Sequence, residues 1–230
     1  MERVAIREGK LPVILFAPHG YDGDDEKTAN MVEHIASVLD CYAVINRGWE
    51  RGPTVDCFAD KADCNNVVHC HEDVVKDEIL DPILRFSKRI MRTHNMAYFF
   101  PIHGMSNKHR KLSGIDDLDI VVGYGAGSPH SYTCDLWRKN YMMHLLDAAG
   151  LTPAEGKKGG PMSGWARNNM NQLFRKWYNQ TYIQGMQLEV IYDLRSDNEL
   201  NLLASEYIAL AIRDLIKAKD FITQREYPSY

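Results

Sequence analysis

The stretch Leu11 to Glu26, LPVILFAPHGYDGDDE, decides the fold that we expect for this chain. Its apolar half is long enough for one buried strand, and this run ends abruptly at Pro18-His19-Gly20. Four carboxylates follow at once, on Asp22, Asp24, Asp25 and Glu26. Ligands of open α/β sheets bind outside the carboxyl ends of the strands, so we expect His19 to lie where chemistry takes place.

The same pattern recurs later in the chain. A second apolar run, Ala97 to Gly104 (AYFFPIHG), ends at His103. A third run, Met186 to Ile191, carries Glu189 in its middle. A charge inside a buried strand needs a partner or a function. We therefore expect two strands to deliver His19 and His103 to loops, with a core glutamate on another strand.

The rest of the chain alternates helices with short strands. Apolar residues at helical spacing predict helices at 27–39, 74–94, 132–149 and 167–178. Further strands are predicted at 42–46 and 118–123, and irregular loops at 47–66 and 152–163. This alternation predicts one α/β domain over residues 1–230, a three-layer sandwich with helices on both faces of a mostly parallel mixed sheet.

The last helix has its own start signal. Ser196 to Glu199 reads as a capping box, in which a serine and a glutamate satisfy the first backbone N–H groups of a helix. The helical spacing then predicts an inward face. The residues expected on it are Leu200, Leu203, Tyr207, Leu210 and Leu215.

Composition excludes several classes of protein. The 230 residues are 45% hydrophobic and 25% charged with a formal net charge of -4, which is typical of a soluble globular protein. No basic stripe is present, so we expect no nucleic-acid partner. No apolar run approaches the ~20 residues that span a bilayer, and no secretory signal is visible. Five cysteines, an odd number, fit reduced thiols, and we expect a cytoplasmic protein.

The histidines suggest a metal site. Catalytic zinc commonly takes three protein ligands from His and Asp or Glu and leaves a fourth position for water. His19 and Asp22 form an HxxD pair, Asp24 is the rival carboxylate, and His103 would complete the set. The alternative is that His19 only ends a strand and that the acids are the solvated start of a helix.

Glu189 and three arginines are further candidates. Glu189 could act as a general base toward a metal-bound water, although period-2 alternation would also let it face solvent. Arg47, Arg51 and Arg167 lie in segments without regular pattern. A guanidinium binds a carboxylate through two parallel hydrogen bonds, so these residues are candidates for substrate binding. The alternative for each is an ordinary surface arginine.

Seven short motifs resemble the N-formylglutamate amidohydrolase-like family in their shared order, and the resemblance covers most of the chain. They are Pro18-His19-Gly20, Val44-Ile45-Asn46-Arg47, Asp63-Cys64-Asn65, Ile102-His103-Gly104-Met105, Asp119-Ile120 with Gly123, Gly159-Gly160 followed by Arg167, and Gln187-Leu188-Glu189. This family is similar in fold to zinc carboxypeptidases and aspartoacylases.

The resemblance implies a zinc-dependent hydrolase, with one ion per chain, that cleaves the amide of an N-formyl or N-acyl amino acid. It implies that His19 and His103 are ligands together with Asp22 or Asp24, and that Glu189 is the catalytic glutamate. It also implies that Asn65 and Arg167 bind the substrate carboxylate. The chain departs from the family's Asp-x-Asn-Arg motif at Asn66, so Arg47, Arg51 or Arg167 would have to replace the missing arginine.

Two other functions stay open at this point. One is a zinc peptidase or a poly-γ-glutamate-type hydrolase with the same fold. The other is a non-catalytic protein that binds a cation or a small acid.

Overall fold

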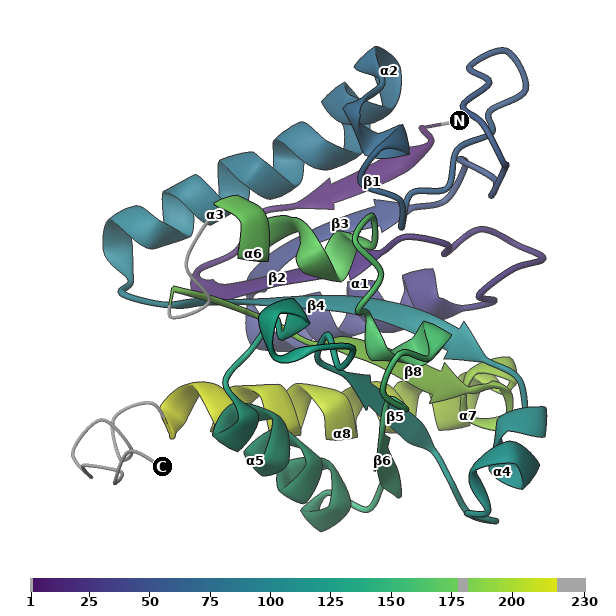
Figure 1. Ribbon diagram of the computed structural model, residues 1–230, viewed down its shortest axis with the longest axis vertical. Coiled ribbons are helices and arrows are strands. Elements are labelled where there is room, and N and C mark those ends of the chain that lie inside the picture. The colour runs from purple at the N-terminus through teal and green to yellow at the C-terminus, as the bar shows by residue number, and fades with distance from the viewer. Residues whose placement is uncertain (1, 178–181, 219–230) are drawn as a thin grey trace.

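A mixed β-sheet forms the middle layer of the computed structural model, which describes residues 2–177 and 182–218 (Figure 1). The strand order is β1-β3-β2-β4-β8-β5-β6, and β7 pairs with the first part of β4. The strands are β1 (Val4–Arg7), β2 (Leu11–Ala17), β3 (Cys41–Asn46), β4 (Ala97–Met105), β5 (Ile120–Gly123), β6 (Pro153–Glu155), β7 (Ile183–Gly185) and β8 (Gln187–Ile191). Only the pairs β1–β3 and β5–β8 are antiparallel among these strands, which confirms the predicted mostly parallel sheet.

Helices cover both faces of this sheet and complete the predicted three layers (Figure 1). On one face lie α1 (Thr28–Leu39), α5 (Leu136–Ala148) and α8 (Asn198–Lys217), whose Ile35, Met142 and Ile212 share one apolar core. On the other lie α3 (Asp81–Thr93) and α6 (Leu173–Trp177), whose Phe86 and Phe174 belong to a second core. The short helices are α2 (Asp73–Val75), α4 (Lys108–Ser113) and α7 (Tyr192–Ser196).

Strand β2 forms where the sequence predicts it. Its residues Val13 to Ala17 are fully buried, because β3 and β4 flank it and helices cover both of its faces. A strand buried on both faces is a continuous apolar run rather than an alternating one. No helix among the described residues has the length and apolar character needed to cross a bilayer.

Several predicted boundaries are wrong. His103 lies inside β4 rather than in a loop, because β8 pairs with Ile102–Met105 and extends the strand. The predicted loop 152–163 contains β6, a three-residue edge strand that begins with proline and has too few residues to show a period. The helix predicted from 132 starts at Leu136. In the predicted segment 167–178, α6 spans only Leu173–Trp177, and Tyr178 lies outside the described residues.

The predicted inward face of α8 is also wrong in part. Leu215 is buried as predicted, but Leu200, Leu203 and Leu210 are 41%, 45% and 38% exposed. The buried face instead carries alanine and isoleucine, at Ala204, Ile208, Ala211 and Ile212. The helix packs against α1, α5 and α7. Because it is apolar on more than one side, its spacing alone does not determine which side is covered.

The start of α8 yields a first testable prediction. The cap is Asp197 and not Ser196, because Asp197 Oδ1 accepts hydrogen bonds from the backbone N–H of Glu199 (2.8 Å) and of Leu200 (3.0 Å). Asp197→Ala should lower the free energy of unfolding by about 1 kcal/mol, a typical N-cap effect. Ser196→Ala is the matched control and should change it by less than about 0.5 kcal/mol. Urea unfolding measures both, and a larger loss for the serine variant would restore the predicted capping box.

Candidate active site

Three parallel strands bring the predicted residues to one edge of the sheet. Strands β2, β4 and β8 run in the same direction, so their carboxyl ends meet. His19 is the second residue after β2, and His103 lies near the end of β4. Glu189 on β8 is the register partner of His103. The sheet itself therefore places these three residues together.

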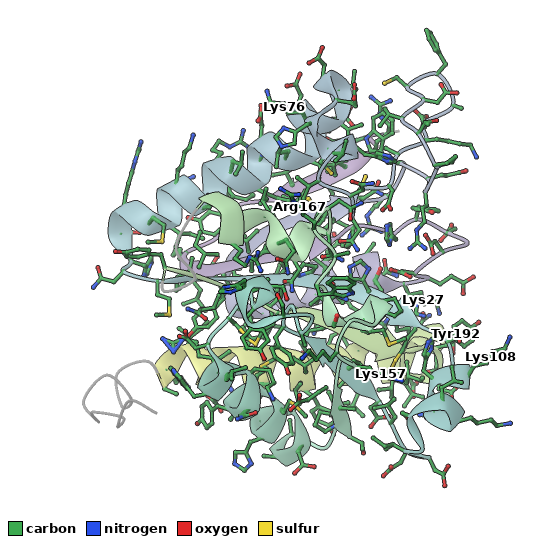
Figure 2. The ribbon with its side chains drawn as sticks, viewed as in Figure 1. Lys27, Lys76, Lys108, Lys157, Arg167 and Tyr192 are labelled. Atoms are coloured by element: carbon green, nitrogen blue, oxygen red, sulfur yellow. The ribbon has the colours of Figure 1, made fainter. Side chains whose placement is uncertain are left out.

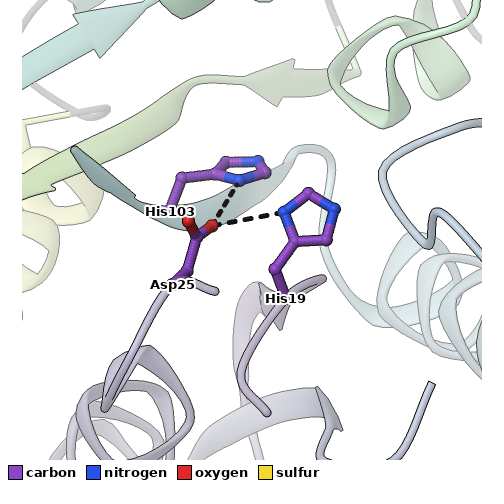
Figure 3. Close-up of side chains that lie close together, drawn as sticks. All are labelled: His19, Asp25 and His103. Carbon is purple, nitrogen blue, oxygen red and sulfur yellow. Dashed lines mark hydrogen bonds and ion pairs between the residues drawn. The ribbon is translucent and has the colours of Figure 1, made fainter. Parts of the chain in front are cut away.

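A carboxylate joins the two imidazoles. Asp25 Oδ2 lies 3.2 Å from His19 Nδ1 and 3.1 Å from His103 Nδ1 (Figure 3). The ring centroids are 5.2 Å apart, and all three side chains are buried. In the part of the chain that the structure describes, no other group of three His, Cys, Asp or Glu side chains lies close enough together to hold a metal ion.

Two more side chains define the state of His19. Its Nε2 lies 2.9 Å from Asp63 Oδ1, and its Nδ1 lies 2.6 Å from Arg51 Nη2. A guanidinium can only donate, so the contact with Arg51 requires a lone pair on Nδ1 and a proton on Nε2, whereas a hydrogen bond to the Asp25 carboxylate requires a proton on Nδ1. A carboxylate on the far nitrogen is the usual way to orient a metal-binding histidine. In the form with the proton on Nε2, this N–H donates to Asp63 and the lone pair of Nδ1 points toward the cluster.

The charges of His19, Asp25 and Asp63 shift one another's pKa values. Burial opposes the charged form of His19, but its hydrogen bonds with Asp25 and Asp63 outweigh burial and raise its pKa. Burial also acts against ionised Asp25, yet hydrogen bonds with His103 and His19 hold the pKa of this carboxyl far below its usual range. The pKa of Asp63 is lowered as well, because the bond with His19 outweighs its burial. The histidines thus help to keep buried Asp25 and half-buried Asp63 ionised.

The pKa of Glu189 is shifted in the opposite direction from those of Asp25 and Asp63. It is buried rather than solvent-facing, so the harmless surface interpretation is wrong. Its Oε1 accepts a hydrogen bond of 2.8 Å from Gln187 Nε2. Burial raises the pKa of Glu189 to about 7, with His103 acting in the opposite direction. A carboxyl group with such a pKa can both take up and release a proton near neutral pH.

This shift predicts a pH-dependent stability difference. Folding favours protonated Glu189, so the contribution is fully present below its ordinary pKa of 4.5 and is lost as the pH rises through about 7. The glutamine of Glu189→Gln does not titrate. The free energy of unfolding of this variant, relative to that of the wild type, should therefore rise by roughly 3 kcal/mol between pH 4.5 and pH 8. Chemical unfolding of chelator-treated protein at both pH values measures the difference. An offset that does not change with pH would contradict the raised pKa.

The donor set fits a metal ion. Two ligands of a tetrahedral zinc ion with bonds of about 2.0–2.1 Å lie roughly 3.3 Å apart. The two Nδ1–Oδ2 separations of 3.2 Å and 3.1 Å are close to this value. The cluster contains the imidazole nitrogens and the carboxylate that zinc prefers. His103 Nε2 is buried without a hydrogen-bond partner in the described part of the chain, so it remains available to a ligand in the pocket.

A pocket of about 570 Å³ opens beside the cluster. Its size is in the range of small-molecule sites. The wall contains polar and apolar groups. Besides the cluster and Glu189 it is lined by Asp24, Arg51, Asp63, Asn65, Gly104, Met105, Ser106, His109, Pro161, Met162, Tyr192 and Arg195.

The carboxylate that joins the histidines is neither of the two predicted from the sequence. Asp22 is exposed and does not line the pocket. Asp24 lines it, but its Oδ2 accepts a bond of 2.8 Å from the Tyr21 hydroxyl and pairs with Arg51 Nε at 3.0 Å. The turn after His19 contains two left-handed residues, Gly23 at φ 98° and Lys27 at φ 62°, and within it Asp25 is the buried carboxylate.

The predicted substrate-binding residues separate into two groups. Arg51 and Asn65 line the pocket. Arg47 does not, because its guanidinium pairs with Glu33 on α1 at 2.7 Å. Arg167 is exposed and outside the pocket lining, and Figure 2 shows it near α6 rather than near Tyr192, which lines the pocket. Sequence reasoning gave no role to Gln187 or Arg195.

Several solved structures of hydrolases are similar to this chain in fold. An N-formylglutamate amidohydrolase from Ralstonia eutropha superimposes with a TM-score of 0.62 at 13% identity, covering 96% of this chain and 100% of that one. A bacteriophage poly-γ-glutamate hydrolase gives a TM-score of 0.52 at 11% identity, covering 92% and 87%. A metallo-carboxypeptidase from Burkholderia cenocepacia gives 0.52 at 12% identity, covering 94% of this chain and 58% of that one.

Sequence comparison adds no closer relative. No protein-family model matches the chain, and no curated protein matches it either. The identities to the solved structures are low, so the likeness concerns the fold. The relationship predicted from the seven motifs is confirmed at that level: the chain has the fold of the N-formylglutamate amidohydrolase and carboxypeptidase-like hydrolases.

Proposed function

We propose that this protein is a zinc-dependent amidohydrolase that cleaves the amide bond of a small carboxylate-bearing substrate, such as an N-formyl or N-acyl amino acid. The observation that carries the proposal is the buried cluster of His19, Asp25 and His103 beside buried Glu189. The likeness to hydrolases of this fold supports it.

The metal would be held by His19, Asp25 and His103, one ion per chain. A zinc ion in such a site acts as a Lewis acid toward the amide carbonyl and lowers the pKa of bound water to about 7. The residues around the ligands prepare the site. Asp63 orients His19, and the burial of all three ligands strengthens every electrostatic contact within the cluster.

Glu189 would move the proton. Gln187 holds its Oε1, which leaves Oε2 for exchange. In the proposed reaction Glu189 takes a proton from the attacking water and returns it to the leaving amine nitrogen. Its pKa of about 7 suits both steps, because efficient general acid–base groups have pKa values near the working pH.

Arg51 and Asn65 would hold the substrate. Arg51 brings a guanidinium to the pocket wall, and such a group is suited to a carboxylate. Asn65 Oδ1 is buried without a partner in the described part of the chain and can accept a bond from a substrate N–H. Asn66 does not line the pocket, and its Oδ1 accepts from the backbone N–H of Val68 at 3.0 Å. Arg47 does not line the pocket, so Arg51 is the arginine that we assign to the carboxylate.

The test is a hydrolysis assay on protein loaded with zinc. The panel contains N-formyl and N-acyl amino acids, the matching compounds without the carboxylate, and γ-glutamyl peptides. We expect turnover of the carboxylate-bearing amides, loss of activity with a chelator, and recovery when zinc is returned. Turnover of γ-glutamyl peptides alone would favour a poly-γ-glutamate-type hydrolase. Stoichiometric zinc without hydrolysis of any compound would favour a binding protein.

A further inference from the structure

Arg195 of α7 is buried behind the cluster, and its guanidinium contacts the sequence neighbours of the site residues. Its Nε donates to the carbonyl oxygen of Val190 at 3.0 Å, and Val190 follows Glu189. Its Nη1 donates to the carbonyl oxygen of Glu26, which follows Asp25. One planar group thus joins the turn that carries the carboxylate to the strand that carries the glutamate.

The third contact involves Gly104, which follows His103 in β4. A Cβ on this residue would lie 2.4 Å from Arg195 Cζ and 2.4 Å from Nη2, which is far shorter than any real contact. Gly104 is not among the residues with positive φ, so space rather than backbone conformation requires glycine there. The guanidinium therefore also fixes the packing beside His103.

Arg195 forms no ion pair in the part of the chain that the structure describes. It is only 3% exposed, and no carboxylate of the described residues lies within ion-pair distance of its guanidinium. The nearby charges of Asp25, Glu26 and Glu189 favour its cation without direct contact, although arginine is rarely buried unless it is paired. Both of its hydrogen bonds go to backbone carbonyls instead. Such an arrangement stabilises a particular relative position of two backbone segments.

We propose that Arg195 is the positioning residue of the site: it fixes the Asp25 turn, the end of β4 and the Glu189 strand relative to one another. The inference rests on the proposed function, since it concerns the geometry of the same metal ligands. Outer partners of metal ligands typically contribute 10- to 100-fold to metal affinity. We expect an effect of this size from Arg195, although it touches no ligand side chain.

The experiment measures zinc affinity rather than turnover. Chelator-treated protein is titrated with zinc against a competing indicator for the wild type, Arg195→Lys and Arg195→Met. The lysine variant keeps the charge, but a single ammonium cannot present the planar fork that reaches both carbonyls. Both variants should bind zinc 10- to 100-fold more weakly. Arg110→Met is the matched control, because Arg110 also binds a carbonyl and pairs with Asp193 of α7 but does not line the pocket. It should bind zinc within about two-fold of the wild type.

A second variant, Gly104→Ala, tests the same contact in a chain that keeps Arg195. Gly104→Ala should displace the guanidinium and weaken zinc binding in the wild-type background. In the Arg195→Met background the same alanine should have a smaller effect, because the atoms with which its Cβ collides are gone. Wild-type zinc affinity in Arg195→Lys, or equal effects of Gly104→Ala in both backgrounds, would overturn the positioning role alone. A wild-type protein that binds no zinc would instead overturn the proposed function and this role together.

Discussion

Glu189→Gln should lower kcat for amide hydrolysis by about 10²- to 10⁴-fold while zinc content stays at the wild-type level. Glutamine cannot accept the water proton, so the proton transfer loses its acceptor. The metal ligands keep their arrangement, because Gln187 can still donate to the amide oxygen that replaces Glu189 Oε1. The loss should fall on kcat more than on KM, since the proposed mechanism places Glu189 at the reacting atoms.

Steady-state kinetics together with elemental analysis measures both quantities on the same preparation. Glu155→Gln is the matched control: Glu155 lies on β6, pairs with Lys139 and does not line the pocket. It should retain wild-type kcat. Full activity of Glu189→Gln would remove Glu189 from the reaction, and a parallel loss of zinc would give it a role in metal binding instead.

Asp25→Asn should weaken zinc binding by more than about 100-fold, the upper end of the effects seen for residues that only support a ligand. Asp25 Oδ2 is the atom that faces both Nδ1 atoms, and an amide oxygen lacks the negative charge that attracts the ion. His19→Ala and His103→Ala should have effects at least as large. Asp22→Asn should leave the affinity unchanged, because Asp22 is exposed and outside the pocket.

Competition titration with a zinc indicator measures these affinities, and circular dichroism confirms that each variant is folded. Asp22 and Asp25 make a matched pair, since both are aspartates in the same turn. A large loss for Asp22→Asn with tight binding by Asp25→Asn would return the ligand role to the residue predicted from the HxxD spacing.

The sequence predicts the sheet well where strands are buried on both faces. Three continuous apolar runs identify β2, β4 and β8, and the same runs carry His19, His103 and Glu189 to one edge. For these residues the local pattern is sufficient, because a parallel central strand must be apolar throughout and a polar side chain in it stands out.

The carboxylate that contacts both histidines, that of Asp25, could not be predicted in the same way. Asp22, Asp24 and Asp25 lie within four positions, and their chemistry is identical. The choice among them depends on the fold of the turn, in which Gly23 and Lys27 are left-handed and Asp25 is the buried aspartate. A lysine in that conformation has no sequence signal of its own. The arginines pose the same difficulty: Arg47 and Arg51 are four residues apart, yet only Arg51 reaches the pocket.

The register pairing of His103 with Glu189 has an evolutionary consequence. Backbone hydrogen bonds between β4 and β8 fix the spacing of these two residues, whereas Arg51 and Asn65 come from the long irregular segment between β3 and α2. Under the proposed function, changes in that segment that keep Asp63, which contacts His19, would alter which molecules are accepted while the pairing of β4 with β8 is retained. A lineage with this architecture would then diversify its substrates around an inherited pair of His103 and Glu189.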